Sequence, residues 1–514
     1  MTTFVQPSLK PTIGKLIPPT YFRSFLPLVA FLAIHFVLRL ITSPSLHYDD
    51  ADLIIYDQSL ELGYSEQPPL YSWIYRLFAL CFGSNLISLT LLRTVLLGSI
   101  PIYLYLAFRN IFHSHKHAIL GAYAVLLVPS LAWHALTYLT HSLLLCVVCA
   151  ATFYRAVRVL RVPSWGNYFL LGFTTGLGFL SKYNFLFFVV ALFTSGLVIK
   201  DIRKQFLNSK MLLAVVVATL VVTPHLWWII QQHESLEAAY VYKSKVGKSL
   251  VFGILPAGVV ELVNNVVLLA APMIVVLLLG APNVFRNAKL TIERFQIYER
   301  WMGSYFVALV LAHLVYILST GASALHERWL EPFYVLLPAY AMIRLVRLPV
   351  LPEQWTRFAY FLGTCAVVLT IARCGQLYLG SAHRGYNPID SDFANVAERL
   401  NDKMPSDSVI VSNNRGLGGN LRFHMPDIPC VSIDHFAYRP PRLKDHSKYL
   451  LVWFAPNGES IPANQRLFTH DVLGIDLPVN ITHQTLELPP IVTGRQTTKI
   501  GFVVISRSRG IPVN

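Results

Sequence analysis

The chain has 514 residues, of which 54% are hydrophobic and 13% are charged. A soluble domain carries about 25% charged residues, so this composition excludes a protein that is soluble throughout. The formal net charge of +15 comes from Lys and Arg residues that lie mostly in short segments between apolar runs. That pattern is typical of membrane orientation and argues against a nucleic-acid partner.

Apolar runs recur through the first three quarters of the chain. Each is near the length of about 20 residues that crosses a bilayer. They predict a polytopic α-helical membrane protein with about 11 transmembrane helices. Residues 1–24 are expected to be cytoplasmic and to precede an uncleaved first span. The run at 251–280 is too long for one perpendicular helix, so we expect tilt or an interfacial turn there. The expected spans are 25–43, 87–108, 118–134, 137–154, 166–181, 183–199, 211–230, 251–280, 301–319, 330–346 and 358–377.

Basic residues set the expected orientation. With the N-terminus inside, the clusters at 155–161 and 200–210 fall on the cytoplasmic side. An odd number of spans then places the loop 44–86 and the segment 378–514 outside. The chain therefore divides into a transmembrane domain at 25–377 and an outer C-terminal domain at 378–514.

The C-terminal segment has the pattern of a small α/β domain. A helix is predicted at 392–403, because Phe393, Val396 and Leu400 recur at helical spacing. The Gly-rich stretch 415–419 does not fit the dinucleotide fingerprint, so no phosphate site is expected there. Strands are predicted at 408–412, 430–433, 449–454 and 499–506.

The first outer loop is unusually acidic. Asp49 or Asp50 can cap a helix of about twelve residues, which Gly63 can end. Two prolines at 68–69 disfavour helix just before them, so Glu66 is expected in extended chain. The second proline suits the start of another helix, whose aromatic residues are typical of the membrane interface. The loop's carboxylates are Asp49, Asp50, Asp52, Asp57, Glu61 and Glu66.

Two functions remain open for these acids at this point. For Asp49, a role as helix cap and a role in catalysis explain the residue equally well. Glu66 is slightly better explained as a solvated loop residue.

The loop resembles that of the GT-C glycosyltransferases, in the branch that includes protein O-mannosyltransferases and lipid A aminoarabinose transferases. The resemblance rests on Asp-Asp-Ala at 49–51 and Glu-Gln-Pro-Pro-Leu at 66–70. Asp50 stands where the family usually has Glu, and Gln67 where some relatives carry Lys or His. Ser-Lys-Tyr-Asn at 181–184, Pro-His-Leu-Trp-Trp at 224–228 and His-Glu-Arg-Trp-Leu-Glu-Pro at 326–332 also match. The last of these is most similar to bacterial lipopolysaccharide galacturonosyltransferases.

The resemblance implies an inverting transfer of one sugar from a polyprenyl-phosphate donor. The acceptor would be lipid A, lipopolysaccharide or another envelope glycoconjugate outside the bacterial inner membrane, on the periplasmic side. Asp49 and Glu66 would be catalytic, and Lys182, Arg328 and His326 would bind the donor phosphate. Asp50 and Tyr64 would contact the acceptor or orient the loop.

Some relatives hold a divalent metal through the acid before Pro-Pro, which is Glu66 here. His233 is a candidate second ligand. Lys243, Lys245 and Lys248 could meet an anionic substrate or the headgroups of membrane lipids.

Two rival functions are compatible with the sequence. A transporter of a lipid-linked or small anionic solute would carry charged residues within its spans. The clearest in-span charges are Arg93, Glu261 and Arg373, whereas most acids lie outside, which favours surface chemistry. A scaffold whose outer domain binds partners is the other rival.

Overall fold

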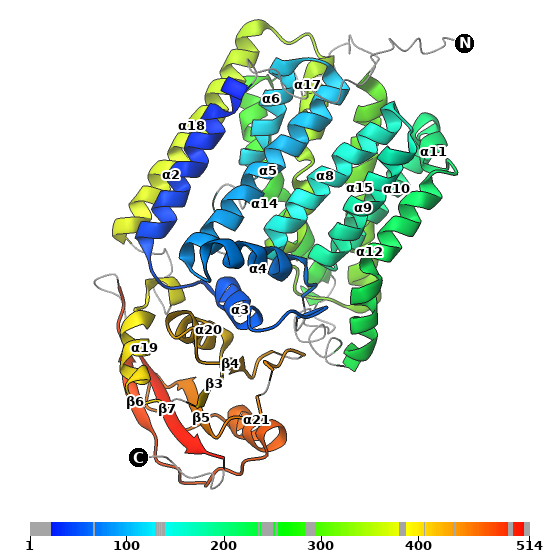
Figure 1. Ribbon diagram of the computed structural model, residues 1–514. Helices are drawn as coiled ribbons and strands as arrows, with labels where there is room; N and C mark the ends of the chain where they lie inside the picture. Colours follow the sequence, from blue (N-terminus) through cyan, green and yellow to red (C-terminus); the bar gives the residue numbers. More distant parts are fainter. Residues whose placement is uncertain are drawn as a thin grey trace.

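Long apolar helices build a bundle, and a small α/β domain lies at one end of it (Figure 1). This architecture confirms the predicted polytopic fold with a C-terminal α/β domain. The computed structural model describes residues 22–64, 67–128, 131, 133, 135, 139–234, 237, 250–251, 255–282, 295–379, 387–405, 407–435, 437–441, 443–491 and 497–507.

Eight described segments are long and apolar enough to cross a membrane, and each coincides with an expected span. The expected spans 118–134, 166–181 and 183–199 correspond to shorter helices, so the total of about eleven stays a prediction. The bundle helices are α2 (Leu26–Thr42), α5 (Leu86–Phe112), α6 (His115–Tyr123), α8 (His141–Arg161), α9 (Trp165–Ser181), α10 (Phe185–Val198), α11 (Lys200–Phe206), α12 (Met211–Gln231), α14 (Ala257–Gly280), α15 (Gln296–Thr320), α16 (Glu327–Tyr334), α17 (Leu337–Arg347) and α18 (Pro352–Leu379).

Two boundaries differ from the expected spans for local reasons. α6 passes into a 3₁₀ turn, η2 (Ala124–Leu127), and Val128 is extended, as a residue before proline prefers. The overlong run at 251–280 becomes helical only from Ala257, after two short paired strands, β1 (Leu250–Val251) and β2 (Leu255–Pro256). The paired strands before Ala257 agree with the turn that was one of the two expectations for this run.

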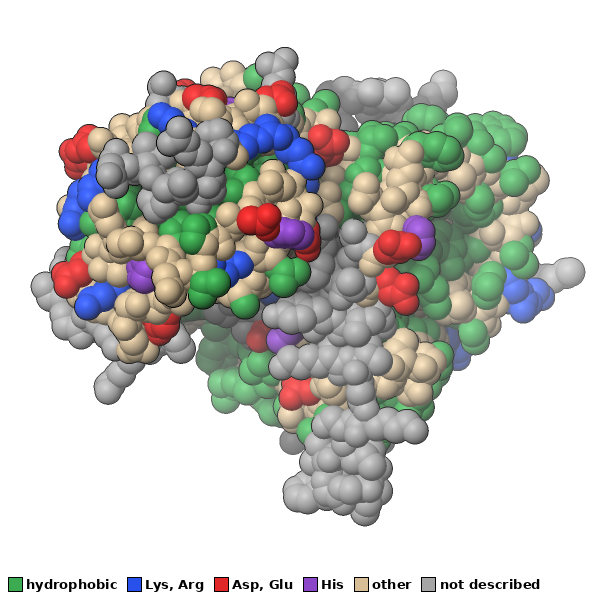
Figure 2. All heavy atoms as spheres, turned by 90° about the horizontal axis from the view of Figure 1, so that it is seen from below, with side chains coloured by type: hydrophobic (Ala, Val, Ile, Leu, Met, Phe, Trp, Pro, Cys, Tyr) green, Lys and Arg blue, Asp and Glu red, His purple; other side chains and the backbone are tan. Residues whose placement is uncertain are grey.

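The outward faces of the bundle helices are apolar. Figure 2, seen from the end that carries the α/β domain, shows charged side chains mainly over that domain and hydrophobic ones beyond it. Such a surface is stable against lipid but not against water. The chain is therefore an integral membrane protein. Strongly exposed apolar side chains include Val37, Leu220, Val267, Val315 and Ile371.

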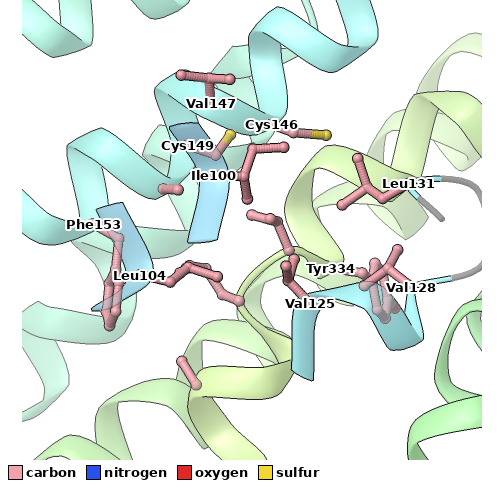
Figure 3. Packing of buried hydrophobic residues seen from close by; sticks show 14 of the residues in the cluster. Ile100, Leu104, Val125, Val128, Leu131, Cys146, Val147, Cys149, Phe153 and Tyr334 are labelled. Atoms are coloured by element: carbon pink, nitrogen blue, oxygen red, sulfur yellow. The ribbon is translucent and has the colours of Figure 1, made fainter. Parts of the chain in front are cut away.

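Close helix packing fills the bundle interior. Ile100 and Leu104 of α5 pack against Cys149 and Phe153 of α8, with Tyr334 of α16 nearby (Figure 3). α9 approaches α12 closely through two glycines four residues apart. A Cβ at Gly172 would lie 2.2 Å from the Ala214 carbonyl oxygen. Small residues at this spacing let membrane helices approach closely.

The terminal domain has a five-stranded sheet in the order β4-β3-β5-β7-β6. β3 is parallel to β4 and β5, whereas β7 is antiparallel to β5 and β6. The four predicted strands and the helix are present, while β6 and α21 are additional and the Gly-rich stretch begins a helix. The elements are α19 (Phe393–Asn401), β3 (Ser408–Ser412), α20 (Arg415–His424), β4 (Cys430–Ser432), β5 (Lys448–Phe454), α21 (Ala463–Leu473), β6 (Gln484–Leu488) and β7 (Thr498–Ser506).

The first loop lies between the bundle and this domain (Figure 1). It forms two helices, α3 (Tyr48–Tyr56) and α4 (Leu70–Phe82). α3 packs on α20, and α4 packs on α5. The acidic loop and the terminal domain thus occupy the same end of the bundle.

Candidate active site

The helix α3 carries the acids of the first loop, but its start differs from the expectation. Its N-cap residue is His47, which makes no side-chain cap hydrogen bond, and Asp49 and Asp50 lie in the first turn. The helix is nine residues long and ends at Tyr56, well before Gly63. The predicted cap at Asp49 or Asp50 and the predicted end at Gly63 are therefore wrong. Carboxylates in a first turn are still favoured by the helix dipole.

Three aspartates of α3 face three different parts of the molecule. Asp50 is fully buried and forms an ion pair with Arg93 of α5, itself 1% exposed. Asp52 contacts Arg415 and His435 of the terminal domain. Asp49 faces Arg328 at the start of α16. Asp49 and Asp50 are consecutive and point in different directions, whereas Asp52 lies one turn further along the helix, nearer the terminal domain.

Asp49 and Arg328 form the most solvent-exposed of these pairs. Asp49 Oδ2 lies 3.6 Å from Arg328 Nη1, and the two side chains are 27% and 45% exposed. An exposed pair contributes only about 0–1 kcal/mol to stability. The pair is thus reachable by a ligand and is not needed to hold the fold.

Lys182 reaches the same region through a serine. Its Nζ donates to Ser142 Oγ at 2.6 Å, and Ser142 Oγ donates to the Arg328 carbonyl oxygen at 3.2 Å. Lys182 is the C-cap of α9, and Ser142 and Arg328 lie in the first turns of α8 and α16. Three helix ends therefore meet here, and Ser142 links Lys182 to the backbone of Arg328, the residue that pairs with Asp49. No motif in the sequence marks Ser142 as a residue of the site.

His326 is the N-cap residue of α16 and is exposed. Its ring packs edge-on against Trp329 at 5.0 Å between ring centroids. It lies two residues before Arg328 in the chain, at the start of the same helix.

Asp50 and Tyr64 are buried rather than open to an acceptor. Tyr64 is 2% exposed. Its hydroxyl donates to the Ser59 carbonyl at 2.8 Å and accepts from the Glu61 amide at 3.0 Å. Of the two roles expected for these residues, orienting the loop is the one that their burial allows.

The remaining loop motifs hold the chain between α3 and α4. His225 Nδ1 donates to the Leu62 carbonyl at 2.7 Å, and Tyr183 stacks on the His225 ring. A Cβ at Gly63 would lie 2.3 Å from the Trp228 ring. The motifs at 181–184 and 224–228 therefore support the first loop.

Glu66 lies outside the described residues. Tyr64 and Gln67, which flank positions 65–66 in the chain, exchange two backbone hydrogen bonds of 3.2 and 2.8 Å. The lysines at 243, 245 and 248 are also outside the described residues.

His233 is exposed just after α12, and its Nδ1 donates to the Ile230 carbonyl at 3.2 Å. Within the part of the chain that the structure describes, no three His, Cys, Asp or Glu side chains gather as a metal site would require.

His47 adds a titratable group that the sequence did not single out. Burial lowers the pKa of His47 below its ordinary value of 6.5, against the opposing effect of Asp49 and Asp50. The imidazole is thus neutral at pH 7 and adds no positive charge beside Asp49.

The bundle and this site define a class of protein. The fold is similar to that of the crystal structure of ArnT from Cupriavidus metallidurans bound to undecaprenyl phosphate. The TM-score is 0.59 at 12% identity, with 93% of this chain and 98% of that chain covered. The similarity shows a GT-C-type fold.

Sequence comparison gives the more particular relationship. A family model described as dolichyl-phosphate-mannose-protein mannosyltransferase matches residues 66–228, which include Lys182 but neither Asp49 nor Arg328. The lipopolysaccharide core galacturonosyltransferases RgtA and RgtB of Rhizobium johnstonii are each 27% identical to this chain. The alignments cover 83% of this chain and 85% of RgtA, and 87% of this chain and 92% of RgtB. The chain is a GT-C glycosyltransferase related to the lipopolysaccharide galacturonosyltransferases.

Proposed function

We propose that the protein transfers one sugar, with inversion, from a polyprenyl-phosphate donor to lipid A or the lipopolysaccharide core. The observation that carries this proposal is the solvent-accessible Asp49 carboxylate 3.6 Å from the Arg328 guanidinium. A base and a cation side by side meet the two needs of the reaction, which are an activated acceptor hydroxyl and a stabilised leaving phosphate.

The chemistry is a single displacement. Asp49 takes the proton of the acceptor hydroxyl as its oxygen attacks the anomeric carbon from the face opposite the phosphate. The bond from that carbon to the phosphate oxygen breaks, and the polyprenyl phosphate leaves with the electron pair. Arg328, with Lys182 and His326, stabilises the negative charge that develops on the leaving oxygen. One displacement inverts the anomeric centre.

The relatives support the substrate classes. RgtA and RgtB are named as galacturonosyltransferases of the lipopolysaccharide core, and the ArnT crystal structure contains undecaprenyl phosphate. We therefore assign a polyprenyl-phosphate-linked uronic acid as donor and an envelope glycolipid as acceptor. The site and the terminal domain then face the periplasm of a bacterial inner membrane, with the basic clusters on the cytoplasmic side.

The three in-span charges that bear on the transporter alternative give it no support. Arg93 is paired with buried Asp50. Arg373 lies over the Trp133 ring at 5.5 Å, and Glu261 is exposed on α14. Each of these three charges therefore has a structural partner or faces outward.

The test of the proposed function is transfer by the purified protein. Polyprenyl-phosphate-linked galacturonic acid should label lipid A or lipopolysaccharide core, whereas the mannose-linked donor should label it much less. Mass spectrometry of glycolipids from cells that lack the protein should show the loss of one sugar. Transfer from neither donor, with unchanged glycolipids, would contradict the proposal.

A second test concerns Glu66 and a metal. We expect Glu66→Gln to lose nearly all transfer, because Pro68 and Pro69 restrict the nearby chain and so lower the entropic cost of fixing a carboxylate at position 66. Glu61→Gln is the matched control on the same loop. The described contacts of Glu61 are backbone ones, including its carbonyl accepting from Trp73 Nε1 at 2.8 Å, and an amide leaves them in place.

Rates for both variants should be measured with and without a chelator. A change at Glu61 is expected to alter stability by no more than about 0.5 kcal/mol. Equal, mild losses from the two variants would remove Glu66 from the site. Chelator-sensitive wild-type activity would support the metal role expected for Glu66 and His233, and insensitive activity would discard a freely exchanging metal.

A further inference from the structure

The terminal domain shares its core with the first loop. One face of its sheet packs against α19 and α20, and Ile55, Tyr56 and Tyr64 of the loop lie in the same hydrophobic cluster as Leu417 and Leu421. All five side chains are nearly fully buried. Separating the loop from the domain would therefore expose apolar surface on both.

A buried amide fixes the chain just before α3. Asn420 of α20 is fully buried. Its Oδ1 accepts from the Leu46 amide at 2.7 Å, and its Nδ2 donates to the Leu46 carbonyl at 3.0 Å. Leu46 lies three residues before Asp49 and directly precedes His47, the N-cap residue of α3. These two hydrogen bonds therefore fix the chain at the start of the helix.

A second pair of hydrogen bonds holds the far end of α3. Gln58 Nε2 donates to the Cys430 carbonyl at 2.7 Å, and Gln58 Oε1 accepts from the Cys430 amide at 2.9 Å. Arg422 Nε donates to the Ile54 carbonyl at 3.3 Å. Both ends of the helix are thus bound to the terminal domain.

Asp52 occupies the edge of the sheet at which open α/β sheets bind ligands. Arg415 follows β3 and His435 follows β4, at the carboxyl ends of two parallel strands. Arg415 Nη1 lies 3.1 Å, and His435 Nε2 3.0 Å, from the Asp52 carboxylate. Asp52 is three residues after Asp49, so the two lie on neighbouring positions of one helical face.

A glycine of α20 allows this helix to contact α3 closely. A Cβ at Gly419 would lie 2.2 Å from the Ala51 carbonyl oxygen. The Gly-rich stretch thus packs against the backbone of α3, and Arg415 at its start pairs with the Asp52 carboxylate. This contact accounts for glycines that match no phosphate-binding fingerprint.

We propose that the terminal domain is a positioning part of the active site, in which α20 and the ends of β3 and β4 hold α3 and thereby fix the Asp49 carboxylate. Asn420 is the main positioning residue. The proposal rests on the proposed function of Asp49 and deepens it. A displacement of about 1 Å at a reacting group can lower a rate by about 10²-fold, so a loosened α3 affects the chemical step more than substrate binding.

The test compares two buried amides of the same domain in the full-length protein. Asn420→Ala should lower kcat by roughly 10–100-fold, with KM for the donor changed less than about twofold. Gln465→Ala is the matched control. Gln465 is also fully buried and donates to the Val411 and Val452 carbonyls at 2.8 and 3.2 Å. The Gln465→Ala substitution should weaken the domain without changing a contact to α3. Its kcat should therefore stay near wild type, while its Tm should fall by about as much as that of Asn420→Ala.

Hydrogen exchange of the amides in α3 supplies a readout that needs no activity. Asn420→Ala should speed exchange in α3, and Gln465→Ala should not. If the wild type transfers no sugar, the proposed function fails, but this difference in exchange still tests the contact. Equal kcat and equal α3 exchange for the two variants would overturn the positioning role and leave the domain structural only.

Discussion

Asp49→Asn is expected to lower the transfer rate by about 10²–10⁴-fold, the range for loss of a general base. The amide keeps the shape of the side chain but cannot take the acceptor proton. Asp49 is not the capping residue of α3, so the variant loses no cap. Its ion pair with Arg328 is exposed and contributes about 0–1 kcal/mol, so folding and membrane insertion should be unchanged.

The measurement is the initial rate at saturating donor and acceptor, together with Tm in detergent. A rate near wild type would leave Asp49 only as a partner of Arg328. A low rate accompanied by a large fall in Tm would show damage to the fold instead of loss of a base.

Asp50→Asn is expected to have the largest effect on stability. The substitution leaves Arg93 buried without its counter-ion, and breaking a buried pair costs about 3–5 kcal/mol. Asp57→Asn is the matched control on the same loop. Asp57 lies 4.0 Å from Arg76, and the two side chains are 16% and 37% exposed, so this half-exposed pair contributes far less than a fully buried one.

Thermal and denaturant unfolding of both variants would measure the difference. Equal, small losses would mean that the Asp50–Arg93 pair does not anchor α3 to the bundle. A large loss for Asp50→Asn alone would establish that anchor.

The site was predicted from sequence only in outline. Motif resemblance points to Asp49, Arg328 and Lys182. The structure pairs Asp49 with Arg328 and links Lys182 to the Arg328 backbone through Ser142. Asp50 was expected to contact an acceptor or orient the loop, and its complete burial against Arg93 was not foreseen. Ser142 and Asn420 had no recognisable pattern, because a serine or asparagine beside a loop is common in any sequence.

The sequence by itself determined where the bundle helices and most of the strands lie. A membrane requires long apolar helices with internally satisfied backbones, and a buried strand requires a short apolar run, so both are local patterns. It also determined that one loop is acidic. Only the tertiary structure decided which cation each aspartate meets and that the terminal domain holds α3. Those contacts join residues that are distant in the sequence, by more than 300 positions for Leu46 with Asn420 and for Asp52 with His435, and no local periodicity encodes them.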